Sequence, residues 1–149
     1  MKSIYEKSVL QEVTSRIEKL KVETKPVWGK MNPAQMMEHC SLIFDFATGK
    51  DKPPRMFIGY ILGPIFKKQY YNDEPMRKNS PTATNYIVST QQDFEKAKSR
   101  LLNLVKDFSE GGEAKCTTHP SPFFGNLTAE QHGMGQYKHL DHHLQQFGV

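Results

Sequence analysis

The sequence predicts an all-α protein, a four-helix bundle in the order up-down-down-up with a long crossover between the second and third helices. Apolar residues recur at spacings of three and four along four segments. Capping residues stand where some of these segments begin. About forty residues separate the second segment from the third, far more than the usual helix–helix connection. The 149 residues fit a single domain, residues 1–149, with one core.

The first predicted helix covers residues 3–22, with charged residues on the face opposite its apolar stripe. The stripe consists of Ile4, Leu10, Val13, Ile17 and Leu20. Pro26 and Gly29 interrupt the helical pattern. This helix therefore has one face suited to a core and one suited to solvent.

The second predicted helix begins in the sequence MNPAQ. Asn32 is a suitable N-cap, Pro33 suits the first helical position, and Gln35 completes a capping box. The helix is expected to continue to about Thr48 and to stop at Gly49.

The third predicted helix covers about 91–109 and ends at two consecutive glycines. Its apolar stripe consists of Phe94, Ala97, Leu101, Leu104, Val105 and Phe108. The fourth starts at the N-cap Thr128, with Gln131 as the capping-box partner, and continues to the end of the chain.

The connection over residues 50–90 is the unusual part of the chain. Insertions of this length are commonly functional or contain structure of their own, and residues 56–66 could form a short helix or two turns. Such a link allows the second and third helices to run parallel.

Composition excludes several classes of protein. The net charge of +4 comes from scattered lysines and arginines, without a long basic run or a nucleic-acid-binding motif. The longest apolar stretch, residues 56–66, is too short for a membrane span, and the N-terminal residues lack the apolar core of a signal peptide. Cys40 and Cys116 have no metal-binding or redox spacing, which suits a reducing cytoplasm.

Three of the six histidines lie between residues 139 and 143. At about 100° per residue, His139 and His143 lie one turn apart on one helical face, the spacing that lets a helix offer two nitrogens to one metal ion. Gln136, His132 and Gln146 fall on the same arc, whereas His142 lies to the other side and is expected to face solvent. By itself this spacing is a weak signal, because a polar helix face can carry it by chance.

A third histidine, His39, lies in the middle of the apolar face of the second helix. A buried neutral histidine with a hydrogen-bond partner is one interpretation. The other is that three imidazoles on facing helices converge on one metal ion, as in many helical bundles. Three ligands leave open positions, which is typical of a catalytic site, and neutral imidazoles suit Zn²⁺, Ni²⁺, Fe²⁺ or Cu²⁺.

Two longer motif blocks surround these histidines. Residues 26–40 read PVWGKMNPAQMMEHC, and residues 119–148 read HPSPFFGNLTAEQHGMGQYKHLDHHLQQFG. Together with the long insert before the third helix, they resemble the DinB-like superfamily of small helical-bundle metalloproteins. They are most similar to its uncharacterised branch with a W-G-x-M-x-x-x-Q-M-x-x-H opening and a K-H-x-x-H-H-x-x-Q-F-G ending. The resemblance covers most of the chain.

The resemblance implies that His39, His139 and His143 bind a divalent metal ion, namely Ni, Zn, Fe or Mn. Trp28, Gln35 and Gln136 match recurrent positions near the metal end of that superfamily. Trp28 could cover the pocket or pack as a core aromatic side chain. Gln35 could have no role other than in the capping box. Gln136 is the better candidate for contact with a ligand. His119, immediately before the last helix, borders the site or forms a turn.

The function predicted from this resemblance is metal-dependent hydrolysis or thiol S-transfer on a small electrophilic substrate, with a low-molecular-weight thiol as a possible partner and a homodimer as a possible assembly. A non-catalytic metal- or small-ligand-binding bundle of stress-response type is the alternative. The third hypothesis is a structural bundle without a metal, in which the histidines are core residues with hydrogen-bond partners. The sequence carries no catalytic triad, phosphate-binding loop or dinucleotide fingerprint, so any enzymatic chemistry would depend on the metal.

Overall fold

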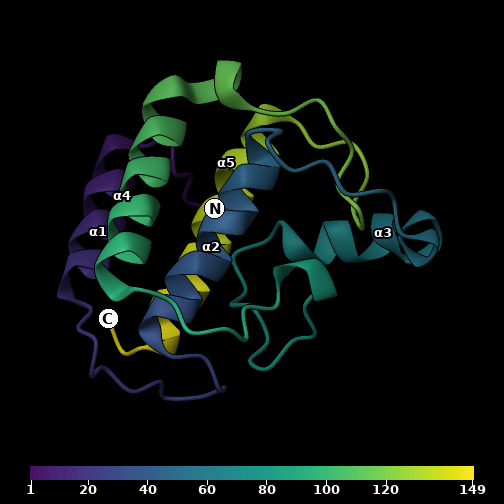
Figure 1. Cartoon of the computed structure of the whole chain (residues 1–149). Coiled ribbons are helices and arrows are strands. Elements are labelled where there is room, and N and C mark those ends of the chain that lie inside the picture. Colours follow the sequence, from purple (N-terminus) through teal and green to yellow (C-terminus); the bar gives the residue numbers. More distant parts are fainter.

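The computed structural model describes residues 1–149 and is all-helical, which confirms the predicted class. Figure 1 shows the arrangement. The α-helices are α1 (Lys7–Lys19), α2 (Pro33–Ala47), α3 (Phe57–Tyr70), α4 (Phe94–Gly111) and α5 (Ala129–Gln146), and the short 3₁₀ helices are η1 (Thr84–Tyr86) and η2 (Gly112–Lys115).

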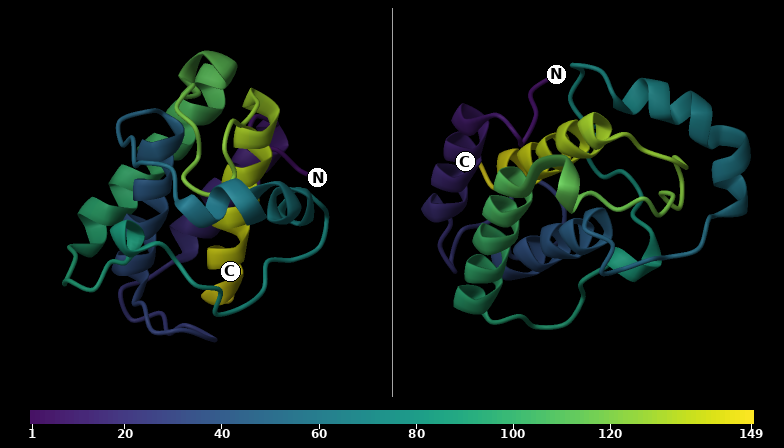
Figure 2. Two further views of the ribbon diagram at one scale, coloured as in Figure 1. Left: turned by 90° about the vertical axis from the view of Figure 1, so that its right-hand side faces the viewer. Right: turned by 90° about the horizontal axis from the view of Figure 1, so that it is seen from above.

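Helices α1, α2, α4 and α5 pack against one another, with α2 and α1 each in contact with both α4 and α5. Gln35, near the start of α2, donates to the carbonyl of Thr90 just before α4, whereas the Thr117 amide, after α4, donates to Ala47 at the end of α2. Helices α2 and α4 therefore run in the same direction. The right-hand view of Figure 2 shows α3 set apart from these four helices.

The helix boundaries follow the capping chemistry. Both predicted capping boxes are present, with Asn32 and Gln35 at α2 and Thr128 and Gln131 at α5. Helix α4 begins later than expected because the side chain of Asp93 caps it. Helix α1 is shorter than expected at both ends, because residues before Lys7 form a turn and the chain after Lys19 becomes extended.

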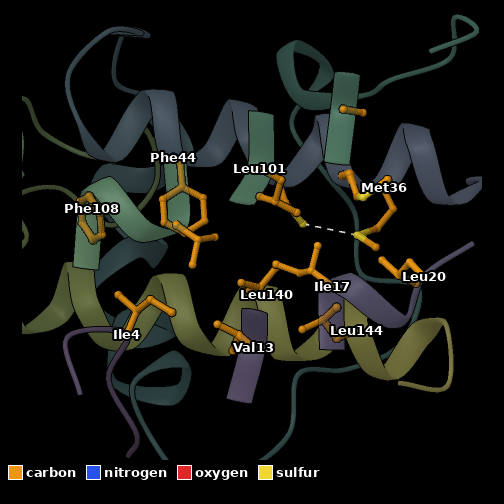
Figure 3. Close-up of a cluster of buried hydrophobic side chains, with 14 of the residues drawn as sticks. Ile4, Val13, Ile17, Leu20, Met36, Phe44, Leu101, Phe108, Leu140 and Leu144 are labelled. Atoms are coloured by element: carbon orange, nitrogen blue, oxygen red, sulfur yellow. Dashed lines mark hydrogen bonds between the residues drawn. The ribbon is translucent and has the colours of Figure 1, made fainter. Parts of the chain in front are cut away.

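The core lies between these four helices, as the close-up in Figure 3 shows. Its largest fully buried side chains include Phe44, Phe108, Met36, Leu101 and Leu140. They come from the apolar stripes at helical spacing. At the edge of the core, the guanidinium of Arg100 on α4 binds the carboxylates of Glu38 and Asp45, which fixes α2 against α4.

The long connection contains the extra helix α3, which packs through its glycines. A Cβ atom on Gly59 would lie 2.7 Å from the carbonyl oxygen of Phe123, and one on Gly63 would overlap the same oxygen. Only glycine permits this close approach of the helix to the loop before α5. The opposite face of α3 exposes large apolar side chains, among them Phe57, Tyr60, Ile61 and Ile65. None of the helices combines the length and apolar composition needed to cross a membrane.

Candidate metal centre

His39 on α2 and the pair His139 and His143 on α5 come together in the structure. One ring nitrogen from each residue lies within 4.8 Å of the others. The Nε2 atoms of His39 and His139 are 3.0 Å apart. His39 and His143 are buried, 3% and 8% exposed. The contact between α2 and α5 therefore makes a compact three-histidine group from residues about a hundred positions apart.

A backbone carbonyl sets the tautomer of His39. Its Nδ1 lies 2.7 Å from the carbonyl oxygen of Tyr86, in η1. A carbonyl oxygen can only accept, so Nδ1 carries the proton of the neutral ring and Nε2 presents a lone pair. That atom lies 3.0 Å from Nε2 of His139.

A side-chain amide does the same for His143. Gln146 donates through Nε2 to the carbonyl of Trp28 at 2.8 Å, which leaves its Oε1 to accept from Nδ1 of His143 at 2.8 Å. The Nε2 atom of His143 is therefore also unprotonated. Gly29 has a φ of 81°, and a Cβ at this position would overlap the Gln146 amide. The Trp-Gly pair thus provides both the acceptor and the space that Gln146 needs.

All three rings are held in the neutral state. Burial is the largest cause, and it lowers the pKa of His39, of His139 and of His143, the last to about 3. The positive charge that each ring would carry opposes protonation of its neighbours at His139 and His143. The hydrogen bonds to Tyr86 and Gln146 act in the opposite direction. Deprotonated imidazoles are the form that binds metal ions.

The spacing of two of the nitrogens, Nε2 of His39 and Nε2 of His139, fits two ligands of one ion, whereas the set as a whole spans up to 4.8 Å. Two nitrogens bound at about 2.0–2.1 Å lie about 2.8–3.4 Å apart when the bond angle is between a right angle and the tetrahedral value. The 3.0 Å between Nε2 of His39 and Nε2 of His139 falls in this range, and without an ion it is a hydrogen bond in which His139 donates to His39. Histidine ligands in metal sites commonly donate their other ring N–H to a carbonyl or amide, as His39 and His143 do. This buried group could hold a metal ion.

A cavity of about 280 Å³ opens from the three histidines. Its walls come from α2, α5, the loop before α5, the end of α3 and residues 76–86. Apolar and aromatic side chains such as Phe46, Phe124 and Leu127 line much of it, and no lysine, arginine, aspartate or glutamate is among the lining residues. The long connection therefore helps to form the cavity, and the cavity wall carries no permanently charged side chain.

The other predicted residues lie at different distances from this cavity. Gln136 lines it, and the carbonyl of Trp28 supports the Gln146 amide, while the Trp28 ring packs on His142. Gln35 caps α2 and donates to Thr90, outside the cavity lining. His119 also lies outside the lining, since its Nε2 donates to the carbonyl of Pro53 and joins two loops.

The expectation that His142 faces solvent is wrong. Its ring lies 5.1 Å from that of His143 and 5.7 Å from that of Trp28, and it lines the cavity. The chain before α2 folds back over this side of α5, which helical arithmetic on one helix cannot anticipate. Burial lowers the pKa of His142, whereas the charge of Asp141 raises it.

Sequence reasoning did not identify what sets the tautomers of His39 and His143. It placed Gln146 on the arc of His139 and His143, three residues after His143, but gave it no role there. Tyr86 contributes only a backbone carbonyl from within the long connection. No residue type in the sequence marks such a contact.

These features define an all-α protein with a buried group of three neutral histidines at the end of a largely apolar cavity. The chain belongs to the family described as protein of unknown function (DUF1569), whose model matches residues 5–148. Comparisons with curated proteins and with solved structures found no match.

Proposed function

We propose that the protein is a divalent-metal-dependent enzyme of the DinB-like type, a hydrolase or thiol S-transferase that acts on a small electrophilic substrate. In this proposal α1, α2, α4 and α5 form a single-domain bundle in the up-down-down-up order, with residues 50–90 as the crossover that shapes the cavity. His39, His139 and His143 hold the ion, which is Ni, Zn, Fe or Mn. The protein works in the reducing cytoplasm.

The observation that carries this proposal is the pair of preset tautomers. Tyr86 and Gln146 accept from Nδ1 of His39 and of His143, which leaves both Nε2 atoms unprotonated in a cluster whose nitrogens lie within 4.8 Å of one another. A histidine with a purely structural role in a core needs only a hydrogen-bond partner. Here three neutral rings are also packed against one another. Metal ligation accounts for all three.

The charge of the cavity indicates the kind of ligand. Three neutral imidazoles leave the charge of a divalent ion uncompensated, and the lining carries no carboxylate. An anionic group such as a thiolate or hydroxide is therefore favoured next to the histidines. When bound, the ion would supply a Lewis acid that makes a water or thiol acidic near neutral pH. The apolar walls would exclude bulk water and hold the uncharged part of the substrate.

The same observation supports a second candidate, a non-catalytic metal- or small-ligand-binding bundle of stress-response type. A hydrolase commonly places a carboxylate beside the metal as a general base, and no aspartate or glutamate lines this cavity. Thiol transfer needs no such carboxylate, since the thiolate itself is the nucleophile. For this reason we place thiol transfer ahead of hydrolysis. The possible homodimer stays a prediction, as does the absence of a nucleic-acid partner.

Turnover by the metal-loaded protein tests the enzyme against the binding bundle. Thiols are offered with electrophiles such as epoxides and activated halides, and esters are offered in parallel without thiol. Product formation that requires thiol and is lost in His139→Ala would support the transferase. Metal binding without turnover of any pair would support the binding bundle.

A further inference from the structure

Two polar atoms in the cavity wall are buried without a hydrogen-bond partner, namely Nε2 of His132 and Oε1 of Gln136. The two residues are 3% and 5% exposed. They lie one turn apart on α5, on the side of the helix that also carries His139 and His143. Buried polar atoms are nearly always paired in folded proteins, so two adjacent unpaired ones in one cavity point to a ligand.

The remaining contacts show what each atom needs. The Gln136 amide donates through Nε2 to the carbonyl of Ile43 at 3.4 Å, so its Oε1 is left as an acceptor toward the cavity. Nε2 of His132 is likewise buried without a partner. In the neutral ring with the proton on Nδ1, Nε2 is an acceptor too. In that tautomer both atoms need a hydrogen-bond donor.

We propose that His132 and Gln136 form a subsite that binds an uncharged hydrogen-bond donor, an amide N–H or a hydroxyl, at one end of the ligand. The other end reaches the three histidines, and this second half of the inference rests on the proposed function. The ligand is thus a molecule with an anionic, metal-binding head and a neutral donor farther along an apolar stem.

Helix geometry sets the length of that stem. Gln136 precedes His139 by three residues and His132 precedes it by seven, which corresponds to about 4.5 Å and about 10.5 Å along the axis of α5. The donor group therefore lies one to two helical turns from the metal-binding head. The Phe46 ring lies 6.2 Å from that of His132 and, with Phe124, gives the stem apolar walls.

The lack of charge in the lining selects a neutral donor over an ammonium group. No aspartate or glutamate lines the cavity, so a buried ammonium would lack a counterion. A divalent ion on the three histidines would also repel it. An amide N–H or a hydroxyl donates its one hydrogen to one of the two acceptors, or shares it between them, and avoids this penalty.

The first test uses metal-free protein and therefore does not depend on the metal. N-butylacetamide and N-butyl-N-methylacetamide differ in the amide hydrogen, and their binding is measured by calorimetric titration. The parent is expected to bind the N–H compound about tenfold more tightly, because the N-methyl compound leaves a buried acceptor unpaired. Gln136→Met and His132→Phe should each reduce this preference, whereas the exposed Gln145→Met should keep it.

The second test uses protein loaded with Co²⁺ and thiols that carry an acetamide group on alkyl spacers of increasing length. Binding is followed through the thiolate-to-cobalt absorption band. The N–H thiols should bind more tightly than their N-methyl counterparts at one spacer length, and Gln136→Met should remove the difference.

The two experiments test the subsite and the metal site independently. A parent that binds neither butyl amide, or binds both equally, would overturn the subsite even if Co²⁺ is held by the histidines. A clear N–H preference in metal-free protein that takes up no metal would support the subsite and contradict the proposed function. A preference that persists in both variants would also overturn the assignment to His132 and Gln136.

Discussion

Gln146 accepts a hydrogen bond from Nδ1 of His143 at 2.8 Å and thereby fixes which nitrogen of the ring is free. Its own amide is oriented by the carbonyl of Trp28, in a turn that Gly29 makes possible. A glutamine near the end of α5 and a turn before α2 thus act together on one imidazole. The orientation of the His143 ring therefore depends on Gln146 and on the turn before α2.

Replacing Gln146 by leucine should weaken metal binding while the fold is kept. Leucine has a similar size but cannot accept from Nδ1, so the ring is free to rotate or to change its tautomer. Losing such a supporting contact typically lowers metal affinity about 10–100-fold. Competition with a chromogenic chelator measures this affinity.

The matched control is Gln145→Leu, one position earlier and exposed, where the amide contacts only Asp141. This variant should bind metal as the parent does. Equal affinities for Gln146→Leu and the parent would show that the contact with His143 has no influence on the metal.

Acidification should destabilise the metal-free protein. Burial holds the pKa values of His39, His139 and His143 below the unfolded value of 6.5. Below pH 6.5 the unfolded chain therefore binds more protons than the folded one, so stability is fully present above this pH and falls as the pH is lowered. The loss is about 1–2 kcal/mol per ring near pH 5.

Urea unfolding of the metal-free parent between about pH 7.5 and 5 measures the effect. His143→Gln should show a shallower decline, since it removes one of the titrating rings. A free energy of unfolding that stays constant or rises on acidification would contradict the assignment of neutral, buried rings.

An alanine at Gly59 or Gly63 should displace α3. The added methyl group would meet the backbone of Phe123, which cannot move aside as a flexible side chain can. Overpacking of this kind typically costs about 1–3 kcal/mol. The loop that moves also lines the cavity, so ligand binding should weaken while metal content stays unchanged.

The exposed Ile61→Ala on the same helix is the control and should leave stability and ligand binding near those of the parent. Thermal unfolding and ligand titration are the measurements. Normal stability in both glycine variants would mean that α3 does not depend on this close approach.

A bound metal ion should raise the stability of the fold. Binding to the folded state alone adds about 2.7 kcal/mol when the free ion is at about a hundred times its dissociation constant. The melting temperature should therefore rise with added metal and return to the metal-free value with chelator. His139→Ala should melt at the same temperature with and without metal.

Much of the helical framework could be predicted from the sequence because it depends on local patterns. The apolar stripes and the two capping boxes are properties of short stretches, and the boxes lie at Asn32 and Thr128 as expected. Helical spacing also placed His139 and His143 on one face, and it placed His39 toward the core.

The other features of the fold and of the site depend on contacts between segments that are distant in the sequence. The sequence predicted a short helix or two turns over residues 56–66, and the structure has a longer helix, α3, over Phe57–Tyr70. The partner of His39 is a backbone carbonyl at Tyr86, which leaves no trace in residue type. His142 lines the cavity and packs against the ring of Trp28, a residue from a distant segment. Tertiary packing decides these features.

The most direct measurement is elemental analysis of the purified, tag-free protein beside His39→Ala and His139→Ala, with His119→Ala as a control histidine outside the cavity. The expected result is near-stoichiometric Ni, Zn, Fe or Mn in the parent and in His119→Ala, and its loss in the other two variants with their helical fold retained. A parent that holds no metal even after reconstitution with each ion would contradict the three-histidine metal centre.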